Sequence, residues 1–270
     1  MTEILDLVQT RHSTRVPFDV KRAVSSEALR QILDAGRWAP SAHNMQNYEI
    51  VIVDDPKTLA AIGRIRREIS VEFLRENYPL LSFSEEELLR RKVGLLGTMF
   101  PPSWRTPDPK PESVAHPEPT RPSFQPTPLL LFVLYDSSRR APASEGDFLG
   151  IISLGCLMEN MWLVAQSLGI GCQIVSFLAS GSVEQEVKEL LRIPESLRIA
   201  FAIRLGYPAE TPAKALRVRR EIEDFTHHNR YGRRGLKQGA ISGGARDPMP
   251  KNRRWARRLK TGRGAGPAWA

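Results

Sequence analysis

DFLGIISLGCLMENMWLVAQSLGIG, residues 147–171, is the stretch from which the fold follows. Between residues 148 and 168 there is a single charge, Glu159, and the apolar residues fall on every side of a helical projection. A helix that is apolar all round has to be buried all round. At the usual rise per residue it is about 30 Å long, which suits either a compact domain or a bilayer.

The core of a soluble protein is favoured over a transmembrane span. In a bilayer, Glu159, Asn160 and Gln166 would lie in hydrocarbon, and no basic cluster flanks the stretch. Gly169 and Gly171 also lead directly into a strand-like run. Because one modest domain does not easily cover every face of such a helix, we expect a dimer that shares it.

Composition favours a cytoplasmic globular protein. The chain has 270 residues, of which 41% are hydrophobic, enough for one substantial core or two small ones. Its two cysteines, Cys156 and Cys172, lie in apolar surroundings and are expected to be free thiols in a reducing compartment. No apolar segment follows Met1, so no secretory signal is expected.

The positive charge is concentrated in a C-terminal tail. Residues 233–270 contain eleven Lys or Arg and one acid, Asp247, whereas the whole chain carries +9, so residues 1–232 are close to neutral. The tail is rich in Gly, Arg and Pro, and its large apolar residues are scattered. We expect it to be disordered. Trp255 between Arg254 and Arg257 keeps open a contact with nucleic acid or an acidic surface.

Hydrophobic periodicity and turn-forming residues predict four strands interleaved with helices. The strands are expected at residues 48–53, 129–135, 172–177 and 197–205. Helices are expected at residues 3–10, 27–36, 148–168 and up to Leu191, the last opened by a capping box from Ser182 to Gln185. Ten prolines between residues 101 and 128 predict a long loop, and residues 207–232 predict an irregular polar arm.

Three polar clusters flank these elements, at residues 11–15, 40–46 and 217–220. Each is a weak signal, since an arginine pair is usually a solvated surface. Together they offer what an anionic, planar, hydrogen-bonding ligand needs: guanidinium groups and Ser13 for a phosphate, and the amides of Asn44 and Gln46 for a ring edge. No phosphate-binding glycine loop, zinc motif or serine hydrolase motif is present, and no metal is expected.

Residues 11–18, RHSTRVPF, resemble the N-terminal signature of the FMN-dependent nitroreductase family, and residues 39–46, APSAHNMQ, are similar to its second signature. The LGIG exit from the long helix at 168–171 and the arm RVRREIE at 217–223 also match in order and spacing. The resemblance covers roughly residues 4–232. Four ordered matches are far more specific than any one of them.

The resemblance implies an α+β fold with a mostly antiparallel, four- to five-stranded sheet flanked by helices and a long central dimer helix. It implies a homodimer with FMN at the interface, in which the C-terminal arm crosses onto the partner. Residues 1–232 would form the FMN-binding domain, with a proline-rich insertion at about 100–128. Residues 233–270 would form the basic, disordered tail.

The resemblance also assigns roles by position. The phosphate would be surrounded by Arg11, Ser13, Arg217 and Arg219, and His12 in the same segment would also bind the cofactor. Arg15 would lie near the phosphate or the pyrimidine edge, where it is a candidate for tuning the flavin. The isoalloxazine or ribityl chain would be lined by Pro40, Ser41, Asn44 and Gln46, and the backbone of Ser176, Phe177 and Leu178 would pass near N5. His43, Tyr78 and Trp104 are weaker candidates for facing the substrate.

The expected activity follows from the cofactor. Hydride would pass from NADH or NADPH through FMN to a small oxidised acceptor such as a nitroaromatic or quinone, in a ping-pong reaction without a catalytic side chain. Two alternatives within the flavin class are reductive dehalogenation and fragmentation of the flavin with oxygen. A third alternative is a protein that binds nucleic acid or an acidic partner through its basic tail.

Overall fold

The computed structural model describes residues 3–65, 85–91, 124–142, 144, 146–211 and 219–235. The chain forms two compact units, the first comprising residues 1–88 and 95–217 and the second residues 89–94 and 218–270. The first unit contains the sheet. Most of the predicted proline-rich loop and the tail beyond residue 235 lie outside the described residues.

The first unit is built on a four-stranded antiparallel sheet with the strand order β1-β2-β4-β3. The strands are β1 (Glu49–Val53), β2 (Leu129–Asp136), β3 (Gly171–Val175) and β4 (Leu197–Gly206). These positions confirm the four predicted strands and the α+β class. The predicted end of the third strand is wrong by two residues, because Ser176 already begins the short helix η3 (Ser176–Ala179).

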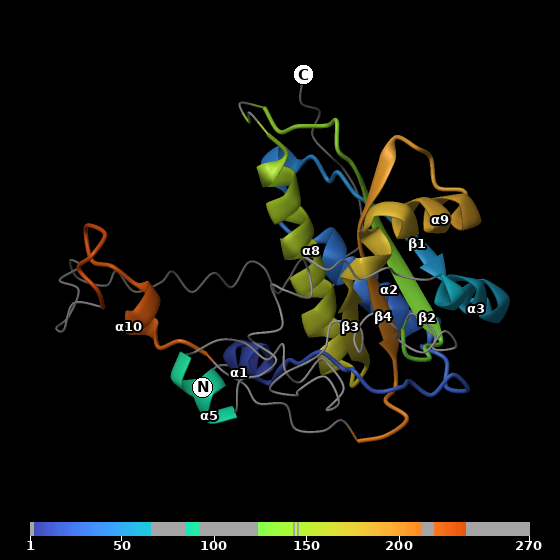
Figure 1. Ribbon diagram of the computed structural model, residues 1–270, viewed down its shortest axis with the longest axis horizontal. Helices are drawn as coiled ribbons and strands as arrows, with labels where there is room; N and C mark the ends of the chain where they lie inside the picture. Colours follow the sequence, from blue (N-terminus) through green and yellow to red (C-terminus); the bar gives the residue numbers. More distant parts are fainter. Residues whose placement is uncertain are drawn as a thin grey trace, which may run out of the picture. The chain divides into compact units, whose positions relative to one another are not determined.

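Alternation along β2 divides the core into two layers. Leu129, Leu131 and Val133 face one cluster, which includes residues of α2 (Ser26–Arg37) and α8 (Phe148–Ser167). The residues between them face a second cluster with α3 (Pro56–Arg64) and α9 (Gly181–Leu191). Successive strand residues point to opposite faces, so one strand serves both layers. In Figure 1, α8 lies on one side of the sheet and α3 and α9 on the other.

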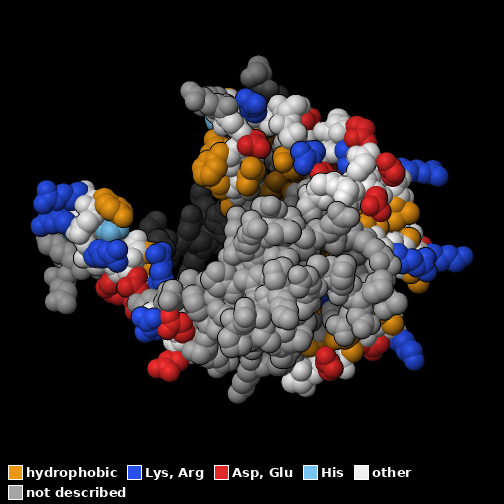
Figure 2. Space-filling view, in the orientation of Figure 1, with side chains coloured by type: hydrophobic (Ala, Val, Ile, Leu, Met, Phe, Trp, Pro, Cys, Tyr) orange, Lys and Arg blue, Asp and Glu red, His pale blue; other side chains and the backbone are white. Residues whose placement is uncertain are grey.

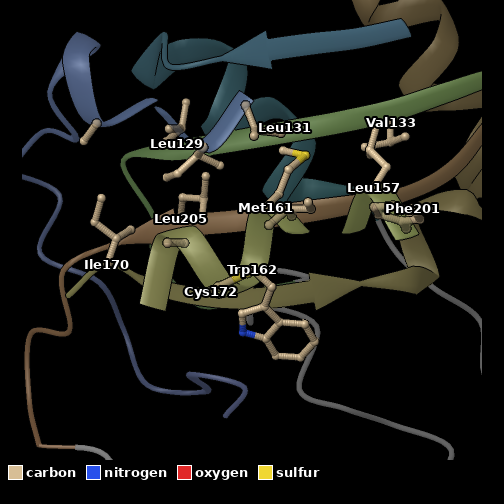
Figure 3. Packing of buried hydrophobic residues seen from close by; sticks show 14 of the residues in the cluster. Leu129, Leu131, Val133, Leu157, Met161, Trp162, Ile170, Cys172, Phe201 and Leu205 are labelled. Atoms are coloured by element: carbon tan, nitrogen blue, oxygen red, sulfur yellow. The ribbon is translucent and has the colours of Figure 1, made fainter. Parts of the chain in front are cut away.

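Packing against the sheet uses one stripe of α8. Leu154, Leu157, Met161 and Ala165 are buried at spacings of three and four residues, and Figure 3 shows Leu157 and Met161 beside the side chains of β2 and β4. In the single chain α8 is therefore not buried on every side, contrary to the expectation drawn from its composition. The partner subunit predicted to cover the rest of it stays a prediction.

The uncovered part of α8 is strongly apolar near its N-terminal end. Phe148 is 68% exposed and Ile151 and Ile152 about half exposed, and Figure 2 shows hydrophobic side chains gathered over this end of the helix. By length and composition alone, α8 is also the one helix among the described residues that could cross a membrane. Its buried stripe belongs to the largest core cluster, as expected of a core helix in a folded domain.

Local capping explains several helix boundaries. The Oγ of Ser25 accepts a hydrogen bond from the backbone of Ala28 at the start of α2, and Asp55 caps α3 ahead of Pro56. The first helix, α1 (Glu3–Thr10), lies where it was predicted. A further helix, α5, spans Glu85–Arg91.

Two sequence expectations about helices are wrong. The capping box from Ser182 to Gln185 does not form, because α9 already begins at Gly181 and Ser182 lies inside it. The arm predicted to be irregular contains α10 (Ile222–Phe225), closed at its N-terminus by reciprocal hydrogen bonds of Glu221 and Asp224. Four residues are too few to give a hydrophobic period, so the pattern of the arm could not reveal this turn.

A pair of glycines seats the N-terminal segment on the sheet. Gly171 of β3 lies opposite Gly206 of β4, and the ring of Phe18 packs over both. A Cβ added at Gly171 would lie 2.6 Å from Phe18 Cε1 and 3.0 Å from Thr14 Cγ2. Only glycine allows this close approach, which places the segment directly before Phe18 against the start of β3.

We predict that Gly171→Ala lowers the free energy of unfolding by about 1–3 kcal/mol, because Phe18 and Thr14 have to move away from the new methyl group. Gly150→Ala is the matched control, since a Cβ there meets nothing within 4 Å and should stabilise α8 by about 0.5–1 kcal/mol. Urea unfolding of both variants measures the difference. Equal stability of the two variants would contradict this account of Gly171.

Candidate functional site

The first polar cluster, Arg11 to Arg15, is an extended segment that we call the polar strip. It follows α1 and is held against the sheet by a hydrogen bond of 2.8 Å from the Thr14 amide to the Cys172 carbonyl. Thr14 is buried, whereas Ser13 is partly exposed and Arg15 exposed. The strip therefore anchors itself through Thr14 and leaves its flanking polar side chains toward solvent.

Arg11 is fixed on α8 by two contacts. Its Nε lies 3.0 Å from Oε1 of Glu159, and its guanidinium lies 4.5 Å from the ring centroid of Trp162. The Trp162 indole also donates a hydrogen bond of 3.3 Å to the His12 carbonyl. Such partly exposed contacts are worth about 0.5–1 kcal/mol each, and together they define where the positive charge lies.

The second polar cluster, residues 40–46, has an unusual backbone. His43, Asn44 and Gln46 all have positive φ, between 46° and 53°, around the single turn η1 (Ala42–Asn44). Left-handed conformations at residues other than glycine cost about 1 kcal/mol or more each, although Asn and His tolerate them better than most. A loop that holds three of them within four residues has its shape imposed by its surroundings.

Hydrogen bonds supply that constraint. Ser41 Oγ accepts from the Gln46 amide at 3.1 Å, and Asn44 Oδ1 accepts from Gln46 Nε2 at 3.1 Å. The loop is fastened to α8 because Ser153 Oγ accepts from the Ala42 amide at 3.0 Å. Its exit is fastened to the end of β2 by the side chain of Asn47, which bonds the backbone of Asp136 in both directions.

The third predicted segment, η3, continues directly from β3. Leu178 is fully buried in the second core cluster, so its side chain is part of the packing and only its backbone is available to a ligand. Ser176 is exposed and Phe177 partly exposed. Since Thr14 is bonded to Cys172, four residues before η3, the strip and η3 are about 13 Å apart along β3.

Helix α8 thus relates the first two clusters to each other. The loop is bonded at Ser153 and the strip at Glu159, six residues or about 9 Å further along the helix. In the described part of the first unit, the strip therefore contacts both α8, which holds the loop, and β3, which leads into η3. Pro40 and His43 are exposed members of that loop.

The remaining predicted residues are not placed with these. Arg219 is described, but it belongs to the second unit. Arg217, Tyr78 and Trp104 lie outside the described residues. Within the described residues, no group of three or more His, Cys, Asp or Glu side chains is close enough to hold a metal ion.

Sequence reasoning missed three residues that position the site: Glu159, Trp162 and Ser153. Glu159 did carry a signal, because it is the single charge in an apolar helix, but the sequence does not show that Arg11 is its partner. Trp162 and Ser153 carry no signal of their own. Their roles depend on which side of α8 each one occupies.

The electrostatics beneath the strip keep Cys172 protonated. Burial raises the pKa of its thiol well above the ordinary range, and the charge of Arg11 opposes this shift only in part. Cys172 is therefore a packing residue rather than a nucleophile at neutral pH. The chemistry that this arrangement can offer is ligand binding: cationic and hydroxyl groups at one end, and amide groups in a rigid loop at the other.

A sequence model described as "Nitroreductase family" matches residues 8–207. Over 87% of its length the chain is 23% identical to an NADPH-dependent oxidoreductase of Staphylococcus haemolyticus (strain JCSC1435), of which 76% is covered. The residues matched by the family model, 8–207, include both the strip and the loop.

Solved structures show the same fold. The crystal structure of a nitroreductase with bound FMN from Bacteroides fragilis NCTC 9343 has a TM-score of 0.51 and 20% identity, over 82% of this chain and 96% of that one. An FMN-dependent nitroreductase of Clostridium difficile R20291 has a TM-score of 0.53 and 17% identity, over 84% of this chain and 99% of that one.

We predict that Cys172 is protected from thiol reagents for as long as the chain is folded. In a Cys156→Ser background, Cys172 should react with a maleimide at pH 8 at least 100-fold more slowly in buffer than in urea, because its thiol is buried and its pKa raised. The loss of maleimide absorbance, as the thiol adds across its double bond, gives the rate. A native rate within tenfold of the rate in urea would mean that the thiol is not buried in the folded protein.

Proposed function

The chain belongs to the nitroreductase family, and on that premise we propose that it binds FMN between two copies of itself and uses NADPH or NADH to reduce a small oxidised acceptor such as a nitroaromatic or quinone. The general activity, that of an FMN-dependent NAD(P)H oxidoreductase, follows from the family and from its NADPH-dependent relatives.

The observation that supports the proposal best is the attachment of the strip and the loop to one helix. The strip offers Arg11, Ser13 and Arg15, a donor set that suits a phosphate dianion. The loop, about 9 Å along α8, offers side-chain and backbone amides in a fixed conformation, which suits the edge of a polar ring. FMN carries both groups on one molecule, so the residues present fit it.

At the phosphate end, Arg11 would bind through a guanidinium whose place is set by Glu159 and Trp162 before the ligand arrives. Ser13 would donate its hydroxyl. Arg15 would lie near the phosphate or the pyrimidine edge, and at the pyrimidine edge its charge would favour the anionic form of the reduced ring. Arg217 and Arg219 are candidates for the same phosphate by the family resemblance alone.

At the ring end, Ser41, Asn44 and Gln46 would orient the ligand, with Pro40 packed beside it. The backbone of Ser176, Phe177 and Leu178 would border the reactive part of the ring. When bound, FMN supplies N5, the atom that takes hydride from the reduced nicotinamide and gives it to the acceptor. The protein would exclude water and hold the reduced nicotinamide and the acceptor in turn. One place used twice gives ping-pong kinetics.

The homodimer is supported by the exposed face of α8. Phe148, Ile151, Ile152 and Glu159 follow one another at helical spacing and share this face. Burying three large apolar side chains there would stabilise an interface by several kcal/mol, at about 25 cal/mol per Å². Because Glu159 holds Arg11, a partner that covers this face would also border the phosphate end of the site.

The cellular setting that we propose is the cytoplasm. Cys156 and Cys172 are free thiols, which suits a reducing compartment, and reduced nicotinamides are cytoplasmic reductants.

The function is tested by reconstitution. We expect the purified protein to bind FMN, to lose the visible flavin absorbance on anaerobic addition of NADPH or NADH, and to regain it with a quinone. Steady-state rates at several acceptor concentrations should give parallel double-reciprocal lines. Arg11→Gln should weaken FMN binding at least tenfold, since a charge-assisted hydrogen bond is worth about 1.5–3 kcal/mol. Arg22→Gln, which lies outside the strip, is the control.

A protein that remains colourless with excess FMN would rule out the function. If FMN binds but neither NADPH nor NADH bleaches it, the proposed reductant is wrong and the flavin site stands. If the double-reciprocal lines intersect, the two substrates do not share one site.

The dimer is tested by placing a charge on the exposed face of α8. Ile151→Glu should raise the dissociation constant of the dimer at least tenfold and weaken FMN binding with it, because a carboxylate would be buried without a partner. Leu190→Glu, on the exposed side of α9, should leave both unchanged. Analytical ultracentrifugation measures the association, and an unaltered dimer in Ile151→Glu would place the interface elsewhere.

A further inference from the structure

Arg204 is a cation buried in the middle of the sheet. It lies in β4 between the core residues Ile203 and Leu205, and none of its surface is exposed. A fully buried arginine normally has a carboxylate partner, because removing its charge from water is costly. Within the residues that the structure describes, no carboxylate pairs with Arg204, so other groups must compensate for its charge.

Backbone carbonyls and an aromatic ring provide that compensation. One terminal nitrogen, Nη2, donates to the Val16 carbonyl at 3.2 Å and to the Pro126 carbonyl at 3.0 Å. The other, Nη1, donates to the side chain of Gln173 in β3. The guanidinium lies 4.5 Å from the ring centroid of Phe18. Burial lowers the pKa of Arg204 to about 10, so the group remains charged at neutral pH.

These contacts join three segments that are far apart in the sequence. Val16 follows directly after Arg15, the last residue of the polar strip, and Pro126 lies near the end of the proline-rich stretch. The two segments are also bonded to each other, since the Phe18 amide donates to the Pro126 carbonyl at 2.9 Å. Arg204 therefore bonds both segments, that of Val16 and that of Pro126, to β4.

The strip is therefore held at both ends by different means. Its first residue, Arg11, is positioned by Glu159 and Trp162 on the outside of α8. Its last residue precedes a carbonyl that is bonded from the interior by Arg204. Losing the interior bond would leave the backbone between Thr14 and Pro17, where Arg15 lies, without an anchor, since the next bond is that of the Ala209 amide to the Pro17 carbonyl. Replacing Arg204 by a neutral residue would also remove a positive charge from the low-dielectric interior behind the phosphate end of the site.

We propose that Arg204 is a positioning residue for the phosphate end of the flavin site. It acts through Val16, holding the strip in the conformation that presents Ser13 and Arg15 to the phosphate. This role rests on the proposed function. In this role Arg204 differs from the arginines of the strip, which would contact the ligand themselves.

The test compares the affinities of the full-length protein for FMN and for riboflavin, which lacks the phosphate. Arg204→Met removes the bonds to Val16 and Pro126, and Arg204→Lys keeps the charge without the planar group that forms them. Arg198→Met is the matched control: Arg198 belongs to the same strand, but pairs with Glu184 at 2.9 Å and contacts nothing in the strip.

We expect the ratio of FMN affinity to riboflavin affinity to fall at least tenfold in Arg204→Met and about threefold or more in Arg204→Lys. It should change less than twofold in Arg198→Met, even though that variant is less stable. A merely structural role would weaken both ligands equally and leave the ratio unchanged, which would overturn the proposal. If Arg204→Met does not fold, Arg204→Lys decides the question alone.

Hydrogen exchange without any ligand gives an independent readout. The amides of Thr14 and Phe18, both hydrogen-bonded within the first unit, should exchange at least fivefold faster in Arg204→Lys than in the wild type, whereas Arg198→Met should leave them unchanged. Unchanged exchange at both amides would overturn the proposal. Failure of the wild type to bind FMN would instead overturn the proposed function, so the two failures are distinguishable.

Discussion

One stripe of α8 packs on the sheet, and the polar segments of the site are attached to the parts of the helix that this packing leaves uncovered. Leu157 and Met161 fix the helix against β2 and β4, and this fixes in turn where Ser153 and Glu159 point. The loop and the strip take their places from those two side chains. The spacing of the site is therefore a property of a rigid helix rather than of two surface segments.

Charges isolated in runs of apolar sequence serve the same purpose. Glu159, on the outside of α8, pairs with Arg11 of the strip, and Arg204, buried in the sheet, bonds the carbonyl of Val16 directly after the strip. Glu184 and Arg198, by contrast, form an ion pair with each other and so join α9 to β4. A buried charge is a poor source of stability. Arg204 is better understood as an anchor for the end of the strip, as Glu159 is for its start.

Much of this could be predicted from the sequence. The strands follow from apolar runs between turn residues, and α8 follows from its length and composition, because such signals are local. The polar segments carry a signal only in combination, because each arginine or amide cluster alone is usually a solvated surface. The partners of Arg11 and the role of Arg204 could not be found in this way. Both depend on contacts across more than a hundred residues, which no local pattern records.

The left-handed backbone of His43, Asn44 and Gln46 has a consequence for the thermodynamics of association. The conformational entropy of the loop is lost during folding, when Ser41, Ser153 and Asn47 bind it, and not when a ligand arrives. Ligand capture by such a loop involves little ordering of the chain. Its calorimetric heat-capacity change then reflects the surface that ligand and protein bury, without a contribution from coupled folding.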